Sequence, residues 1–213
     1  KHSLSAHLDA EILLAHYLNV DRGYLYAHPD KKISNHYLED FLCAIEKRKT
    51  GVPIAYIIGK KEFWSMQMIV NSKTLIPRPE TEILVEKTLQ LIPNNTKKRI
   101  LDLGTGTGAI GIAIAKERPL CQIIGTDISI SALKVASENA RQLNIKNIHF
   151  IGSNWIEAFK NTEFDLIVSN PPYIANNDPH LSALSQEPLK ALVSGPKGLD
   201  AIKEIIHKSK NII

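Results

Sequence analysis

The chain has 213 residues, which is enough for one large domain or for a small domain and a medium one. Its 44% hydrophobic and 23% charged residues are typical of a globular protein, and no apolar run approaches the length of a membrane span. The net charge is +4 and the lysines are scattered, so the charge does not argue for a nucleic-acid partner. Cys43 and Cys121 are far apart and lack the spacing of a metal site. They favour a reduced, cytoplasmic protein.

Helical periodicity dominates residues 1–60. Leu8, Ile12 and Ala15 fall on one helical face, and a second amphipathic pattern runs over 37–48. We expect a small helical domain of three or four helices here, without a chemical motif of its own.

Residues 61–80 change in character. The apolar side chains from Phe63 to Val70, Trp64 included, are strand-like, and 71–73 is a turn. Residues 75–79 contain two prolines and must be extended, because the residue before a proline avoids helical geometry. We expect a linker with a short β-hairpin, followed by a helix over 80–91.

From residue 99 onward strand patterns alternate with helical patterns. The expected strands cover 99–103, 122–126, 148–151 and 164–169, and the expected helices cover 109–117, 131–143 and 199–213. Such alternation predicts an α/β domain over 81–213, with a Rossmann-like parallel sheet that binds its ligand at the carboxyl ends of the strands.

A glycine-rich turn follows the first of these strands. Glycines let the backbone pass close under a ligand, and the helix N-terminus after them can face a polar group. Asp102, just before the turn, could hold an ammonium group, and Asp127, at the end of the second strand, could accept hydrogen bonds from a ribose diol. The candidate cofactor residues in and around this turn are Asp102, Gly104, Thr105, Gly106, Thr107, Gly108 and Asp127.

The same turn admits a dinucleotide cofactor. Residues 106–111 match the GxGxxG pattern, and Asp127 lies 21 residues after Gly106. Alone this match is weak, and a turn without a ligand is the plain alternative. Asp102 and the motif after the fourth strand favour S-adenosylmethionine.

That motif is Asn170-Pro171-Pro172-Tyr173, where two prolines end the strand sharply. A planar amide or amino nitrogen is a weak nucleophile, so a site must accept hydrogen bonds from its N–H groups. The Asn170 side-chain carbonyl and the Pro171 carbonyl can do this, Pro172 makes the segment rigid, and Tyr173 offers a stacking face. Positioning suffices for the transfer, and we assign no general base.

A tryptophan follows the third strand. Trp155 could pack on an adenine whose amino group Asn154 or the backbone reads, and ordinary core packing is the alternative.

Together these motifs resemble the class I release-factor glutamine methyltransferases, the HemK/PrmC group. Residues 75–82, 51–59, 62–64 and 9–14 are similar to further signatures of that family. The resemblance implies methylation of the glutamine in the Gly-Gly-Gln loop of peptide-chain release factors, with S-adenosylmethionine as the cofactor and no direct nucleic-acid partner. It implies that the glycine turn, Asp127, Trp155 and Asn170 line the cofactor pocket, that 170–173 hold the glutamine, and that 1–60 dock the release factor.

The chain departs from the family pattern at two places. Asn154 stands where the family often has Asp, and no strands follow Ile213, so we expect an incomplete chain with an open sheet edge.

Three other functions deserve comparison. A nucleic-acid amino methyltransferase, acting on adenine or guanine, would share the Asn-Pro-Pro-Tyr chemistry but predicts a concentrated basic surface and base-flipping aromatics, which do not stand out. An oxidoreductase would need a proton donor that the scattered histidines do not supply. A binding module with a dead site is at odds with the intact motif.

Overall fold

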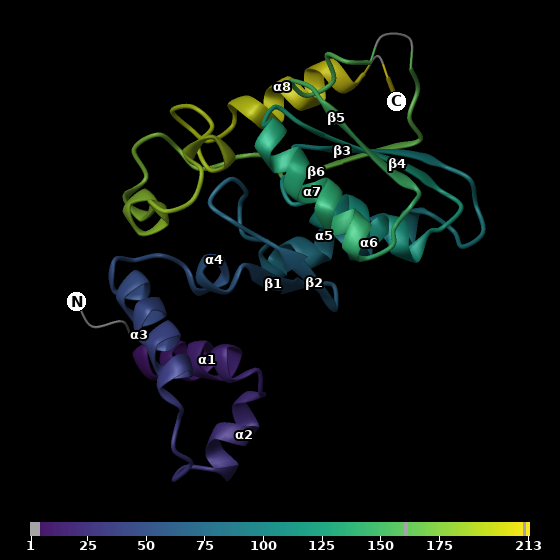
Figure 1. The fold of residues 1–213 in the computed structure, drawn as a ribbon. Coiled ribbons are helices and arrows are strands. Elements are labelled where there is room, and N and C mark those ends of the chain that lie inside the picture. Colours follow the sequence, from purple (N-terminus) through teal and green to yellow (C-terminus); the bar gives the residue numbers. More distant parts are fainter. Residues whose placement is uncertain (1–4, 160–161, 211) are drawn as a thin grey trace. The chain divides into compact units, whose positions relative to one another are not determined.

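The computed structural model describes residues 5–159, 162–210 and 212–213 (Figure 1). It divides into two compact units, Lys1–Gly59 and Lys60–Ile213. In the described residues no helix combines the length and the apolar character needed to cross a membrane.

The first unit is helical, as its periodicity predicts. Its described part contains α1 (Ala6–Leu18), α2 (Arg22–Ala27), α3 (Asn35–Lys49) and α4 (Ile54–Ile58). An ion pair of 2.8 Å between Arg48 Nε and Asp9 Oδ2 joins α3 to α1. Glu11 joins α2 to α1, since its carboxylate accepts hydrogen bonds from Tyr26 and Arg22, which lower its pKa.

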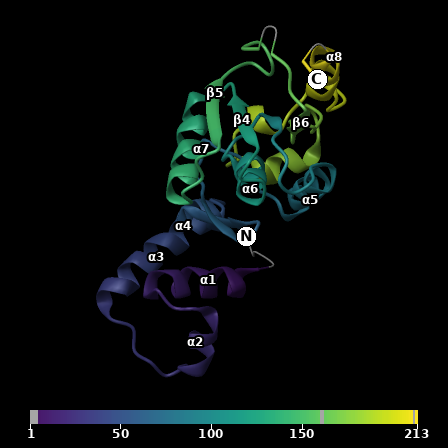
Figure 2. The same cartoon turned by 90° about the vertical axis from the view of Figure 1, so that its right-hand side faces the viewer.

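The second unit is built on a parallel sheet of four strands in its described part. The strands are β3 (Arg99–Leu103), β4 (Gln122–Asp127), β5 (Ile148–Gly152) and β6 (Leu166–Ser169). Their order is β5-β4-β3-β6, and every neighbouring pair is parallel. Figure 2 shows β5, β4 and β6 in this sequence across the unit. The parallel sheet predicted for this region is therefore confirmed.

Alternating side chains of these strands enter two separate cores. Ile100 and Ile123 pack with α5 (Glu82–Leu91), α6 (Ala109–Glu117) and α7 (Ile130–Gln142) on one face of the sheet. Leu101 packs on the other face with Ile205 of α8 (Asp200–Ser209). The sheet is thus covered on both faces, which explains why apolar residues predominate in its strands.

A hairpin precedes the sheet. Strand β1 (Lys60–Phe63) pairs antiparallel with β2 (Met66–Ile69). The expectation that Trp64 lies in a strand is wrong: Trp64 and Ser65 form the connecting turn, both with φ of +53°. Two-residue hairpin turns need this left-handed geometry, and neither residue carries the usual Gly or Asn signal.

Asn139 of α7 fastens this hairpin to the sheet domain. Its Oδ1 accepts a hydrogen bond of 2.7 Å from the N–H of Ile69, and its Nδ2 donates to the carbonyls of Ile69 and Thr107 at 3.1 and 2.9 Å. The one polar residue on the buried face of α7 therefore connects β2 with the glycine-rich turn.

Candidate active site

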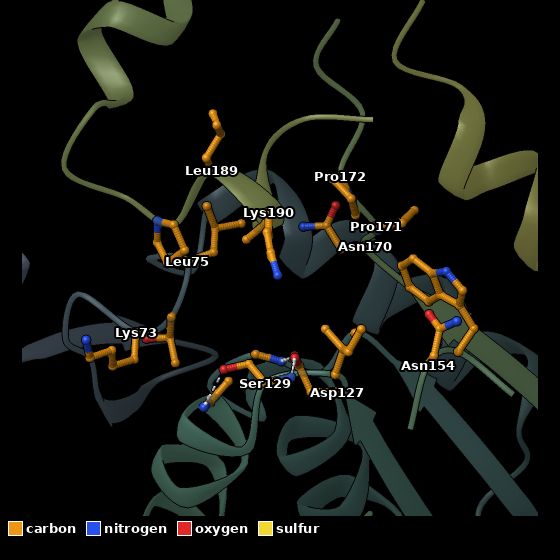
Figure 3. Close-up of a pocket in the computed structure, with 18 of the residues that line it drawn as sticks. Lys73, Leu75, Asp127, Ser129, Asn154, Asn170, Pro171, Pro172, Leu189 and Lys190 are labelled. Atoms are coloured by element: carbon orange, nitrogen blue, oxygen red, sulfur yellow. Dashed lines mark hydrogen bonds between the residues drawn. The ribbon is translucent and has the colours of Figure 1, made fainter. Parts of the chain in front are cut away.

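A cavity of about 520 Å³ lies at the carboxyl ends of the four parallel strands. Gly104 and Gly106 after β3, Asp127 at the end of β4, Trp155 after β5 and Asn170 after β6 all line it. Its volume falls within the range of about 300–1,000 Å³ that is usual for small-ligand sites. The structure thus brings together residues that the sequence placed at four separate strand ends. Figure 3 shows three of the lining residues, Asp127, Asn154 and Asn170, around this cavity.

The glycine-rich turn borders the cavity through only two of its glycines. Gly106 has a φ of +57°, and a Cβ added there would meet no atom within 4 Å, so bare backbone faces open space. Gly108 has a packing role instead, since a Cβ there would lie 2.8 Å from Ile112 Cδ1. Thr105 and Thr107 are buried behind the turn. An exposed glycine backbone is what a closely bound ligand requires.

Asp127 forms part of the cavity floor (Figure 3). Its Oδ2 accepts a hydrogen bond of 2.9 Å from the N–H of Gly106, and its Oδ1 accepts one of 2.8 Å from the N–H of Ser129. A carboxylate has about four acceptor positions, so both oxygens keep capacity for a diol. The backbone contacts fix the carboxylate in place for that task.

Asp127→Ala is expected to raise the Kd for S-adenosylmethionine by about 10- to 100-fold, because hydrogen bonds to a charged group contribute about 1.5–3 kcal/mol. Isothermal titration calorimetry measures the change. Asp178→Ala, an acidic position outside the cavity, is the matched control and should leave the Kd unaltered. Equal Kd values for Asp127→Ala and the unaltered chain would remove Asp127 from the cofactor site.

Asp102 does not line the cavity. It is fully buried beneath the turn, where its Oδ2 accepts hydrogen bonds from Thr105 Oγ1 at 2.6 Å and from the N–H of Gly111 at 3.0 Å. Its Oδ1 is buried without a hydrogen-bond partner among the described residues. Direct contact with a cofactor ammonium stays a prediction, while the observed contacts give Asp102 a part in holding the turn.

Burial raises the pKa of Asp102 to about 6, against the opposing hydrogen bonds from Thr105 and Gly111. Between pH 4 and 6 the unfolded chain has lost this proton while the native chain keeps it, so native stability falls as pH rises and levels off near pH 7. An asparagine does not titrate, so the free energy of unfolding of Asp102→Asn, measured relative to that of the unaltered chain, should rise by about 3 kcal/mol from pH 4 to pH 7. Urea unfolding across this range tests it, and parallel pH profiles for the two proteins would contradict it.

Trp155 and Asn154 form the wall after β5. Trp155 has a φ of +50°, a strained geometry for a bulky residue, and its indole lies against Gly104, 3.4 Å from where a Cβ would stand. Asn154 Nδ2 donates to Glu157 Oε1 at 2.8 Å. The side-chain carbonyl oxygen of Asn154 is the end of the amide that can accept a hydrogen bond from a ligand, and its contact with an adenine stays a prediction.

The Asn-Pro-Pro-Tyr segment contributes three of its four residues to the cavity: Asn170, Pro171 and Pro172. Tyr173 is 61% exposed and does not line the cavity, so its stacking role stays a prediction. Its carbonyl is packed against Gly198, where an added Cβ would lie only 2.1 Å from that oxygen. The hydrogen bonds from Ile174 N to Leu192 O and from Ser194 N to Ile174 O, both 2.9 Å, hold the same loop.

Two further wall segments were not foreseen: one around Leu75, the other around Lys190 (Figure 3). Buried Glu187 joins them, because its Oε2 accepts a hydrogen bond of 3.1 Å from the N–H of Ile76 and its Oε1 pairs with the Arg78 guanidinium. No local pattern reveals such a contact, since its partners lie more than 100 residues apart in sequence.

Comparison with known proteins agrees with this geometry. The family model "Methyltransferase small domain" matches residues 79–193, and "PrmC N-terminal domain" matches residues 1–59. Among solved structures, the METTL16 methyltransferase domain without its N-terminus has a TM-score of 0.52 at 21% identity, covering 69% of this chain and 66% of that one, which shows the fold.

Curated relatives are much more similar in sequence. A release factor glutamine methyltransferase of Xylella fastidiosa (strain Temecula1) is 48% identical, over 92% of this chain and 72% of the relative. Those of Coxiella burnetii and Escherichia coli K12 are 46% and 44% identical, each over 99% of this chain and 76% of the relative. The chain therefore belongs to the release factor glutamine methyltransferase family.

Proposed function

We propose that this chain transfers a methyl group from S-adenosylmethionine to the side-chain amide nitrogen of the glutamine in the Gly-Gly-Gln loop of peptide-chain release factors. Family membership supports the reaction, the cofactor and a release-factor substrate. The observation that carries the chemistry is that Asn170 and Pro171 border the same cavity as Gly106 and Asp127.

The cofactor half of the cavity fits the methyl donor. When bound, S-adenosylmethionine supplies a methyl group on a sulfonium, whose sulfur leaves with the electron pair of the broken C–S bond. Gly104 and Gly106 would lie under it, Asp127 would accept from its ribose hydroxyls, and Trp155 with Asn154 would contact the adenine. The open space over Gly106 supports this assignment.

The other half of the cavity, formed by the Asn-Pro-Pro-Tyr segment, would bind the nucleophile, which is the glutamine amide. The Asn170 side-chain oxygen and the Pro171 carbonyl accept the two N–H groups of the glutamine amide, which raises electron density on its nitrogen and aims it at the methyl carbon. As the new N–C bond forms, the nitrogen loses one proton, which passes to water. Tyr173 would provide a flat face beside the entering side chain.

We assign the domains by the same reasoning. Residues 1–60 would dock the release factor, 61–80 would form a linker with the hairpin, and 81–213 would perform the transfer. A cytoplasmic location, where release factors act, is part of the proposal. No direct nucleic-acid substrate is included in it.

Methylation with tritiated S-adenosylmethionine tests the substrate. The panel contains a purified release factor, the same factor with its Gly-Gly-Gln glutamine changed to alanine, RNA and DNA. Label on the unaltered release factor alone is the expected result. Label on RNA or DNA instead would agree with methyl transfer but contradict the proposed release-factor substrate. Label on the alanine variant would contradict the proposal that this glutamine is the methylated residue.

A further inference from the structure

We infer that Thr81 is a positioning residue that holds the Asn170 amide in the orientation needed for methyl transfer. The inference rests on the proposed role of Asn170 as the acceptor for the substrate amide. Its observation is a hydrogen bond of 3.2 Å from Asn170 Nδ2 to Thr81 Oγ1. Thr81 ends the short helix η1 (Pro79–Thr81), 89 residues before Asn170 in sequence.

The orientation of this amide decides what the site can bind. The two ends of an asparagine amide are alike in shape but opposite in hydrogen bonding, and the torsion that carries the amide is soft. Only the oxygen end can accept the substrate N–H. While Asn170 uses its oxygen for the substrate, its NH₂ needs an acceptor elsewhere, and Thr81 Oγ1 supplies one.

Thr81 is itself held on both sides. Its own N–H donates to the carbonyl of Arg78 at 3.0 Å, and Arg78 is paired with Glu187, whose side chain is only 3% exposed. On the other side, Glu82 Oε1 accepts a hydrogen bond of 2.8 Å from the N–H of Trp64. Because the backbone on both sides of Thr81 is held by these contacts, the Thr81 hydroxyl has a fixed position. It can therefore hold the Asn170 amide in one orientation.

Thr81→Val keeps the branched shape and removes the acceptor. We expect kcat for release-factor methylation to fall about tenfold, because an unheld amide spends most of its time in unproductive orientations. The Kd for S-adenosylmethionine should stay within about twofold, since Thr81 does not line the cavity. Thr81→Ser keeps the hydroxyl and should retain most activity. Thr96→Val, which removes a hydroxyl bonded to the Pro93 carbonyl outside the cavity, should change neither quantity.

A double-mutant cycle separates positioning from general packing. In an Asn170→Ala background the residual transfer, followed as tritium incorporated over hours, should not fall further when Thr81→Val is added. An equal loss for Thr81→Ser and Thr81→Val, or an additive loss in the double variant, would overturn the inference in favour of local packing. A rise in Kd that matches the fall in kcat would overturn it in favour of a cofactor contact.

The single variants also separate this inference from the proposed function. Unchanged transfer by Asn170→Ala would remove the proposed role of Asn170 and the role of Thr81 with it. A large loss for Asn170→Ala together with full activity of Thr81→Val would leave the proposed function intact and overturn only the inference about Thr81.

Discussion

Asn170→Ala is expected to lower kcat for release-factor methylation by about 100-fold or more, while the Kd for S-adenosylmethionine changes by less than about threefold. Removing one preorganised hydrogen-bond partner of a reacting group typically costs a factor of about 10²–10³ in rate. Asn170 would act mainly on the nucleophile, so the loss should appear in kcat rather than in cofactor binding. Single-turnover methylation and calorimetry on the same preparation measure the two quantities.

Asn177→Ala provides the comparison for this variant, because Asn177 is exposed in the loop that follows the motif and does not line the cavity. It should keep full activity. Transfer by Asn170→Ala within severalfold of the unaltered chain would show that another group accepts the substrate amide. A loss confined to cofactor affinity would move Asn170 to the cofactor side of the site.

The largest effect on stability is expected for Asn139→Leu. Asn139 is 1% exposed, and a leucine there would remove the partner of the part-buried N–H and carbonyl of Ile69 and of the buried carbonyl of Thr107. Each such orphaned group costs about 1–3 kcal/mol, so unfolding free energy should fall by about 3 kcal/mol or more. Urea denaturation followed by circular dichroism measures it.

Lys134→Leu, at an exposed position of the same helix, controls for the added leucine and should change stability by no more than about 0.5 kcal/mol. The Asn139 variant should also bind S-adenosylmethionine more weakly, because Thr107 belongs to the glycine-rich turn. A loss below about 1 kcal/mol would mean that the hairpin is held mainly by its apolar contacts.

The sequence predicts the framework of the site well because that framework is local. Strand β3 and helix α6 occupy the predicted residues, since an apolar run followed by three glycines leaves the backbone few alternatives. Gly106, Asp127 and Asn170 meet because neighbouring parallel strands end at one edge of the sheet.

What the sequence does not predict depends on contacts between distant loops. Thr81 lies within residues 75–82, which resemble a family signature, but that resemblance does not predict its hydrogen bond to Asn170, and Glu187 lies in no motif at all. The burial of Asp102 behind the turn and the exposure of Tyr173 escape prediction for a related reason: a position next to a motif fixes the backbone, not the direction of the side chain.

The contacts of Glu187 have a consequence for the order of events during folding. Its partners Ile76 and Arg78 lie 111 and 109 residues earlier in the sequence, so this wall of the cavity closes only after the chain has been made as far as residue 187. Such long loop closures are slow compared with local helix and hairpin formation. During synthesis on the ribosome, the glycine-rich turn can therefore form well before the wall that faces it. A nascent chain that ends before residue 187 would lack a completed cavity.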